Sequence, residues 1–456
     1  MRRLTLRANA YDGDAVLAAD LDPTLAQRWT MRNAPSEVRP ELRKSRADER
    51  SWRDPQVGYG VILADAPQLV VGAKDTGLGA PEPIRLLIAE RDAPVFRYRP
   101  DSEYPLSYLY DYANDCDNSI ASAPVGTGKG RLPRYLLIYG EPADIPWSLQ
   151  FALNAQRAVG RLHLRDDALA RYVDALLGTW TQPLSDDADT LVWMTDHGPD
   201  DITALMSRIF AELAAEFGQD AKLSCMTIDG QIATHRALTD GLAEKRPRVI
   251  VTASHGMTGP VSDAAAMRAQ LGMLVDRDFA CLDPGELLRR WSPNGAIWYA
   301  HACCSAGSDD VTAFAELVGD DTALGRSLTA IAALGAQISP LPTALLGAEQ
   351  PLRAFVGHVE PTFDWTLQDP NSGQEFGDDL RRALYDELFD GSPVGWALRR
   401  HWARMGSALA SYDIKKSRFN RGENAAEGML HDLLVARDVM TTVVLGDPTV
   451  AVAEMV

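Results

Sequence analysis

The sequence has no apolar run long enough to cross a membrane or to form the core of a secretory signal. Its first residues mix charged and apolar side chains, and no stretch approaches the roughly 18 uncharged apolar residues of a membrane span. We therefore expect a soluble cytoplasmic protein that does not act on a membrane.

Cysteine and histidine are scarce: five cysteines and eight histidines occur in 456 residues, and no Cys-x-x-Cys pair is present. This composition excludes a disulfide framework and argues against a zinc site. Cys303 and Cys304 are adjacent, and a bond between neighbouring cysteines is severely strained, so both are expected to be free thiols. We expect neither a metal nor a cofactor in the chemistry.

Basic residues are too few for nucleic-acid binding. Forty-five Lys and Arg stand against 63 Asp and Glu, which gives a net charge of −18. Binding to phosphate groups requires clustered positive charge, so nucleic acid is not an expected partner.

At 456 residues, with 46% apolar and 24% charged residues, the chain is typical of a soluble protein with more than one core. A polar stretch at 182–187 marks a boundary between an N-terminal region, 1–185, which includes a charged arm at 32–54, and a second domain, 186–456. In the second region, strands alternate with helices, which predicts an α/β fold with a parallel sheet and right-handed crossovers.

Hydrophobic patterning predicts the individual elements. Apolar runs lie at 59–63 and 69–72, and expected strands lie at 83–89, 134–139, 190–195, 223–228, 249–254, 296–302 and 353–356. Expected helices lie at 148–158, 200–217, 233–243, 263–270, 284–290, 311–318 and 324–334, with two more between 376 and 412. Asp200 or Asp201 is the expected cap of the helix at 200–217.

Two of these strands end in reactive side chains. The run from Val249 leads into His255-Gly256, and the run from Ala296 leads into Ala302-Cys303-Cys304. In a parallel sheet, neighbouring strand ends share one crevice, so an imidazole and a thiol would meet there. That pair suits nucleophilic catalysis by cysteine. The alternative interpretation is a cysteine buried as a small apolar residue and a histidine satisfied within a turn.

The glycine after the histidine suits the same chemistry. Without a side chain, Gly256 lets a substrate backbone approach closely, and its N–H together with that of the cysteine could bind an oxyanion.

In order and spacing, these motifs resemble the caspase-like (clan CD) cysteine peptidases, which include caspases, metacaspases, gingipains, separases and bacterial CHAT-type proteases. His255 lies 48 residues before Cys303, and caspases carry their histidine about 50 residues upstream of the nucleophile. The strings Gly140-Glu141 to Pro146 and Leu445-Gly-Asp-Pro448 resemble gingipain-like segments. The resemblance implies a caspase-like parallel sheet flanked by helices, with an N-terminal, gingipain-like, non-catalytic α/β subdomain.

The resemblance implies that His255 is the general acid–base, held by backbone carbonyls without an acidic partner. Two thiols compete as the nucleophile. An Ala-Cys-x-x-Ala-Gly alignment favours Cys303, whereas a Cys-x-x-Gly alignment favours Cys304; we prefer Cys303. The residue two before the nucleophile, His301, would line the primary specificity pocket, and Asp309 could add an acid. We expect an uncharged or basic residue before the cleaved bond.

The implied function is a cysteine endopeptidase that cleaves a specific protein substrate, in a regulated bacterial defence or cell-death system. The substrate could be a gasdermin-like pore former, and an activating partner is expected. The main alternative is a catalytically silent caspase-like scaffold that binds partners. A further alternative is another thiol enzyme, such as an acyltransferase or an amidase.

Overall fold

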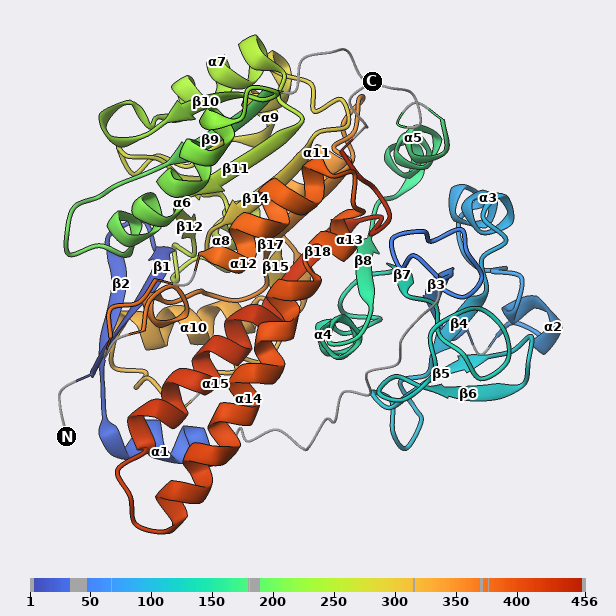
Figure 1. The fold of residues 1–456 in the computed structure, drawn as a ribbon, viewed down its shortest axis with the longest axis horizontal. Helices are drawn as coiled ribbons and strands as arrows, with labels where there is room; N and C mark the ends of the chain where they lie inside the picture. The colour runs from blue at the N-terminus through green and yellow to red at the C-terminus, as the bar shows by residue number, and fades with distance from the viewer. Residues whose placement is uncertain are drawn as a thin grey trace.

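The computed structural model describes residues 4–32, 47–66, 68–178, 180, 189–314, 316–369, 372–375 and 377–452. Most of the expected charged arm and the expected boundary at 185/186 lie outside these ranges. Within them, a 12-stranded, mostly parallel sheet has the order β10-β9-β11-β14-β17-β18-β8-β7-β3-β4-β5-β6 and is flanked by helices (Figure 1). A mixed α/β architecture with a large parallel sheet is therefore present, as predicted.

The strands of the large sheet are β3 (Tyr59–Ala64), β4 (Val95–Tyr98), β5 (Tyr108–Asp111), β6 (Cys116–Ser119), β7 (Tyr135–Tyr139), β8 (Ala158–Leu162), β9 (Asp189–Met194), β10 (Ser224–Ile228), β11 (Val249–Ala253), β14 (Ile297–His301), β17 (Ala354–His358) and β18 (Thr442–Gly446). A second sheet contains β1 (Leu4–Tyr11), β2 (Val16–Leu21), β12 (His255–Met257) and β13 (Leu274–Val275), and a two-stranded sheet contains β15 (Gly307–Ser308) and β16 (Gln337–Ile338).

The α-helices are α1 (Pro23–Arg32), α2 (Val71–Lys74), α3 (Glu82–Glu90), α4 (Trp147–Asn154), α5 (Asp166–Leu177), α6 (Ile202–Gln219), α7 (His235–Lys245), α8 (Ala264–Gln270), α9 (Pro284–Arg290), α10 (Ala323–Ala333), α11 (Pro340–Leu346), α12 (Asp378–Arg382), α13 (Val394–Ala397), α14 (Arg399–Asn420) and α15 (Ala426–Thr441). Short 3-10 segments occupy Gly230–Ile232 and Asp364–Thr366, and a π-helical segment occupies Ala383–Glu387.

The predicted strand–helix alternation is confirmed from β9 to β11. The strands β10, β9, β11, β14 and β17 are parallel neighbours. Asp201 caps α6 through a hydrogen bond from the Thr203 amide, and Thr234 caps α7 in the same way. Each capped helix follows a strand through a short loop, as crossover connections in a parallel sheet require.

Two predicted elements were wrong. The segment 83–89 is not a strand but belongs to α3, because Ile84, Leu87 and Ile88 recur at helical spacing and are buried, and a proline stands at the start of the helix. The expected helix at 311–318 is absent: its described residues form bends and turns.

The strands β1 and β2 were not predicted, although apolar and polar residues alternate along β1 from Leu4 to Ala10. Leu6, Ala8 and Ala10 are fully buried. In Figure 1 this hairpin lies beside β12, across the molecule from β3 to β6. The N-terminal residues therefore pack on the C-terminal half of the chain.

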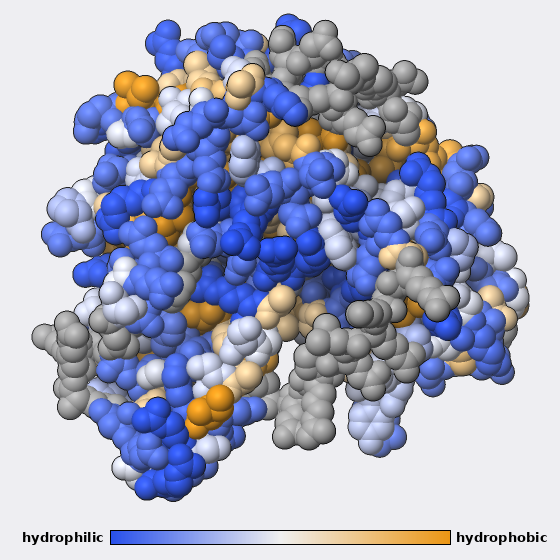
Figure 2. All heavy atoms as spheres, viewed as in Figure 1, coloured by the Kyte–Doolittle hydropathy of each residue, from blue (hydrophilic) through white to orange (hydrophobic). Residues whose placement is uncertain are grey.

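Charged and polar residues cover most of the face drawn in Figure 2. Among the described residues, no helix combines the length and apolar character that a membrane crossing needs.

A buried charged network joins the end of β18 to β3 and to the C-terminal end of α3. Asp447, which follows β18, is fully buried and accepts hydrogen bonds from Tyr59 Oη at 2.7 Å and from the Thr449 amide at 2.9 Å. Its carboxylate lies 3.2 Å from the Arg91 guanidinium, whose side chain is 6% exposed. Each charge in this site therefore depends on the other for compensation.

We expect Asp447→Ala to lower the free energy of unfolding by about 3–5 kcal/mol, because Arg91 would keep a buried charge without its partner. Denaturant unfolding measures this value. Asp447→Asn should cost less, since it retains hydrogen-bonding capacity, and Asp48→Ala, which removes an exposed ion pair with Arg50, should change little. An Asp447→Ala variant as stable as the wild type would contradict this account.

Candidate active site

The parallel pairing of β11 and β14 brings together the two predicted motifs. Ala253 lies opposite His301, and the Ser254 amide donates to the His301 carbonyl at 3.2 Å. Two residues after Ser254, Gly256 packs so closely on the other loop that a Cβ there would lie 1.9 Å from the Cys303 carbonyl oxygen. The His255-Gly256 segment and the turn at Cys303 are therefore backbone neighbours, and only glycine fits at position 256.

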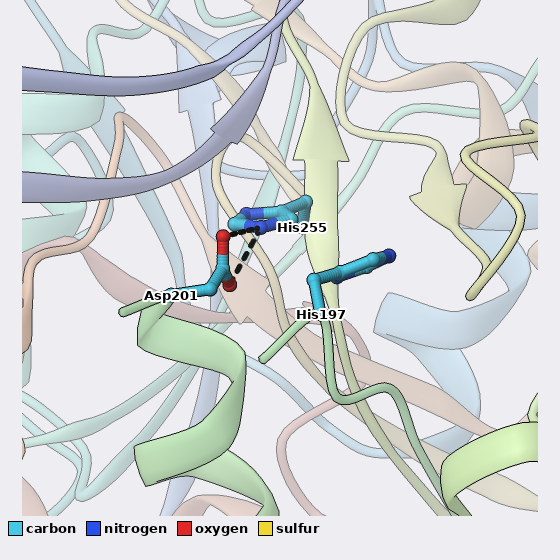
Figure 3. Close-up of side chains that lie close together, drawn as sticks. All are labelled: His197, Asp201 and His255. Atoms are coloured by element: carbon cyan, nitrogen blue, oxygen red, sulfur yellow. Dashed lines mark hydrogen bonds and ion pairs between the residues drawn. The ribbon is translucent and has the colours of Figure 1, made fainter. Parts of the chain in front are cut away.

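His255 is fully buried and pairs with a carboxylate. Its Nε2 lies 3.0 and 3.1 Å from the two oxygens of Asp201, and the two side chains point toward each other in Figure 3. Its Nδ1 is buried and has no hydrogen-bond partner among the described residues. Because the carboxylate can only accept a hydrogen bond, Nε2 carries the N–H, and in the neutral ring the lone pair is on Nδ1.

Asp201 is held as an anion. Burial acts to raise the pKa of this carboxyl, but hydrogen bonds from His255 and Thr203 outweigh it and lower the pKa to about 2. The sequence predicted Asp200 or Asp201 only as a helix cap, and no acidic partner for His255 was expected, so the pair of His255 with Asp201 corrects that expectation. Asp201 reaches His255 because it follows β9, which is the parallel neighbour of β11.

His197 completes a cluster with this pair but does not form a convincing metal site. One ligand atom each from His197, Asp201 and His255 lies within 4.8 Å of the others. The two imidazoles, however, stack with their centroids 5.3 Å apart and their planes 25° apart. Ring nitrogens bind metals in the plane of the ring, so stacked rings do not direct two lone pairs at one ion. The His197 Nε2 also already lies 3.1 Å from the Asp276 carbonyl.

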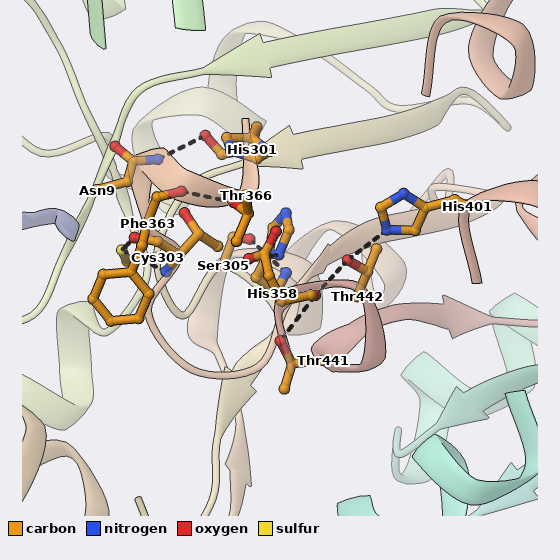
Figure 4. A network of polar contacts seen from close by, with 12 residues as sticks. Asn9, His301, Cys303, Ser305, His358, Phe363, Thr366, His401, Thr441 and Thr442 are labelled. Atoms are coloured by element: carbon orange, nitrogen blue, oxygen red, sulfur yellow. Dashed lines mark hydrogen bonds and ion pairs between the residues drawn. The ribbon is translucent and has the colours of Figure 1, made fainter. Parts of the chain in front are cut away.

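The Cys303 thiol is buried within the network of polar contacts drawn in Figure 4. Its sulfur lies 3.2 Å from the Thr362 amide nitrogen and 3.7 Å from the Thr362 carbonyl oxygen. Burial raises the pKa of this thiol well above its ordinary value. In this conformation Cys303 is therefore a protonated thiol hydrogen-bonded to the backbone.

Cys304 occupies a different environment. It has a left-handed backbone conformation, with φ at 55°, and its side chain belongs to an apolar cluster with residues of α8 and α10. Burial raises the pKa of this thiol too. Its packing is that of a small apolar side chain.

The two residues predicted to contact substrate lie in different surroundings. His301 is buried, its Nδ1 lies 3.0 Å from Tyr299 Oη, and burial lowers its pKa to about 4, so the ring is neutral at pH 7. Asp309 follows β15, and burial raises its pKa to about 6. Its charged neighbours are Asp310 and Arg161, and no contact links it to His301 among those recorded for the described residues.

The sequence matches no known protein family and no curated protein. Among solved structures, the chain is similar to the crystal structure of the Saccharomyces cerevisiae separase–securin complex, with a TM-score of 0.34 and 11% sequence identity. The similarity covers 71% of this chain and 16% of that chain. The assignment of a function therefore depends on the residues and geometry of the site itself.

We expect Asp201→Asn to lower the free energy of unfolding at pH 7 by about 2 kcal/mol. Asparagine still caps the helix, so the change isolates the charge. Because the pKa of Asp201 falls from 3.8 to about 2, this stabilisation is complete above pH 4 and is lost as the pH falls through 2. Urea unfolding at pH 7, 4 and 2.5 measures the difference, and a difference that stays constant over this range would contradict the prediction.

Proposed function

We propose that this protein is a cysteine endopeptidase. Cys303 is the nucleophile and His255 the general acid–base. Asp201 is a positioning residue that acts through His255, and the amides of Cys303 and Gly256 bind the oxyanion.

The observation that carries the proposal is the state of the His255 ring at the junction of two parallel strand ends. Asp201 holds Nε2, Nδ1 is left without a partner, and the next residue, Gly256, packs on the Cys303 backbone. A base held by a third group and placed beside a nucleophile is the arrangement that activates cysteine.

The proposed chemistry proceeds in two balanced steps. His255 Nδ1 takes the thiol proton, the sulfur attacks the peptide carbonyl carbon, and the C–N bond breaks as His255 returns the proton to the leaving amine. Water then adds to the thioester with His255 as the base, which releases the carboxylic acid and regenerates the thiol. The negative oxygen formed in each step accepts hydrogen bonds from the two backbone amides.

The step requires the thiol to leave Thr362 and face His255. Rotation about χ1 of Cys303 exchanges one orientation of the sulfur for another, at the expense of the contacts with the Thr362 backbone. We therefore treat the observed thiol as a resting state.

The buried thiol favours a second candidate, a scaffold in which Cys303 has only a structural role. A thiol with a raised pKa, hydrogen-bonded to Thr362, is what an inert core cysteine would also show. Labelling with an iodoacetamide probe separates the two: a peptidase gives labelling at Cys303 that depends on His255, whereas a scaffold does not.

We propose that the substrate is a protein or an extended peptide and that the enzyme is activated by cleavage or by a partner. We also propose a role in bacterial defence, in which the substrate is a pore-forming protein. Another thiol enzyme, an amidase for example, would cleave small amides and leave peptides intact.

We expect Cys303→Ala and His255→Ala each to reduce kcat/KM for peptide cleavage by about 1,000-fold or more, because the two residues act as one unit. Cleavage is measured by mass spectrometry on a peptide library, with the chain both as purified and after limited proteolysis.

The matched control is Cys304→Ala, which removes the neighbouring thiol and should retain most of the activity. Thermal melting checks that all three variants fold. If Cys304→Ala is inactive and Cys303→Ala is not, the nucleophile is Cys304. If the wild type cleaves nothing in either form and its Cys303 stays unlabelled, the scaffold is the better description.

A further inference from the structure

Strand β1 passes through the candidate active site, where both the backbone N–H and the backbone carbonyl of Asn9 are hydrogen-bonded. The Asn9 amide donates to the Thr362 carbonyl at 2.9 Å, and the Asn9 carbonyl accepts from the Cys303 amide at 3.3 Å. Thr362 is the residue that also binds the Cys303 thiol. The backbone of Asn9 is therefore bound directly at the proposed nucleophile.

The pairing of β1 with β12 directs the Gly256 N–H, which is the second proposed oxyanion donor, to the carbonyl oxygen of Asn9. The strands are parallel, with Ala10 opposite Gly256, and the Thr258 amide donates to the Tyr11 carbonyl at 2.9 Å. In a parallel ladder, donors alternate along the strand, so the Gly256 N–H two residues earlier faces the Asn9 carbonyl. A carbonyl of the chain itself thus lies where the carbonyl of a cleaved peptide bond would be polarised.

The neighbouring residues of β1 are held as a bound peptide would be. Ala8 forms an antiparallel bridge with Phe363. The Arg7 guanidinium lies 3.6 Å from the Asp364 carboxylate. Residues 7–10 therefore run extended along the segment 362–364 on one side and β12 on the other, which is β-strand addition by a segment of the same chain.

The side chain of Asn9 is buried against the end of β14. It is fully buried, its Nδ2 donates to the His301 carbonyl at 3.2 Å, and its Oδ1 has no partner among the described residues. The His301 ring is in edge-to-face contact with His358, with centroids 4.8 Å apart, and burial lowers the pKa of both rings, so they are neutral. A charged side chain in this position would be buried without a partner, which opposes its binding.

We propose that β1 is a built-in occupant of the substrate groove, and that the pocket at His301 selects asparagine before the cleaved bond. This inference rests on the proposed function and names its substrate class: extended peptides that end in Asn at the pocket, with a basic residue two positions earlier. In the uncut chain, residues 7–11 must leave before such a peptide can bind.

The test opens the groove in the full-length chain. A recognition sequence for a site-specific protease is inserted in the exposed turn at 13–15, so that one protein is compared before and after the cut. Acetyl-Leu-Arg-Ala-Asn with a fluorogenic leaving group is the probe, and matched probes carry Asp, Gln or Lys in place of Asn. Circular dichroism and thermal melting verify that the cut protein stays folded.

We expect the cut to raise kcat/KM for the Asn probe by about 10-fold or more, and Asn to exceed Asp by about 100-fold. Cleavage that is unchanged by the cut, or that favours another residue, would overturn the inference and leave the proposed peptidase standing.

A binding measurement separates failure of the inference from failure of the chemistry. Fluorescence anisotropy with labelled Leu-Arg-Ala-Asn-Ala-Tyr is carried out on the cut Cys303→Ala variant, with the Asn→Asp peptide as control. If the Asn peptide binds and the Asp peptide binds about 10-fold more weakly, while the cut wild type cleaves neither, the groove is supported and the catalytic proposal is overturned. Absence of binding would overturn the groove itself.

Discussion

The candidate site depends on the in-register parallel pairing of β11 with β14. Parallel neighbours end at the same edge of a sheet, so the pairing of Ala253 with His301 brings His255 and Cys303 to one place. The contact is then fixed by Gly256, where a Cβ would overlap the Cys303 carbonyl. Any side chain at Gly256 would separate the two loops, and with them the base, the thiol and the backbone amides.

Around this junction, the proposed base and the proposed nucleophile have different surroundings. Asp201 fixes the His255 ring and leaves one nitrogen available. Cys303 is instead protonated and turned to Thr362. For the proposed peptidase chemistry, the limiting factors are therefore the orientation and the exposure of the sulfur.

Apolar runs identified the strands that end at His255 and Cys303, and capping patterns identified the start of α6, because these signals are local. The role of Asp201 could not be read in the same way, since it depends on which strands become neighbours. The run at 83–89 was misassigned because short apolar segments fit a strand or a helix equally well. The alternation of Leu6, Ala8 and Ala10 was visible in the sequence, but its partner, β12, is distant in the chain.

The burial of the thiol and the placement of β1 have a common cause. Cys303 belongs to the same apolar cluster as Leu6, Ala8, Ala10 and Phe363, so the side chains that hold β1 in place also exclude water from the sulfur. Burial is the largest cause of the raised pKa of Cys303. If β1 left the groove, water would reach the thiol, its pKa would fall toward the ordinary value, and the thiolate would become accessible at the moment a substrate could enter. In the proposed mechanism, opening of the groove and activation of the nucleophile are therefore one physical event.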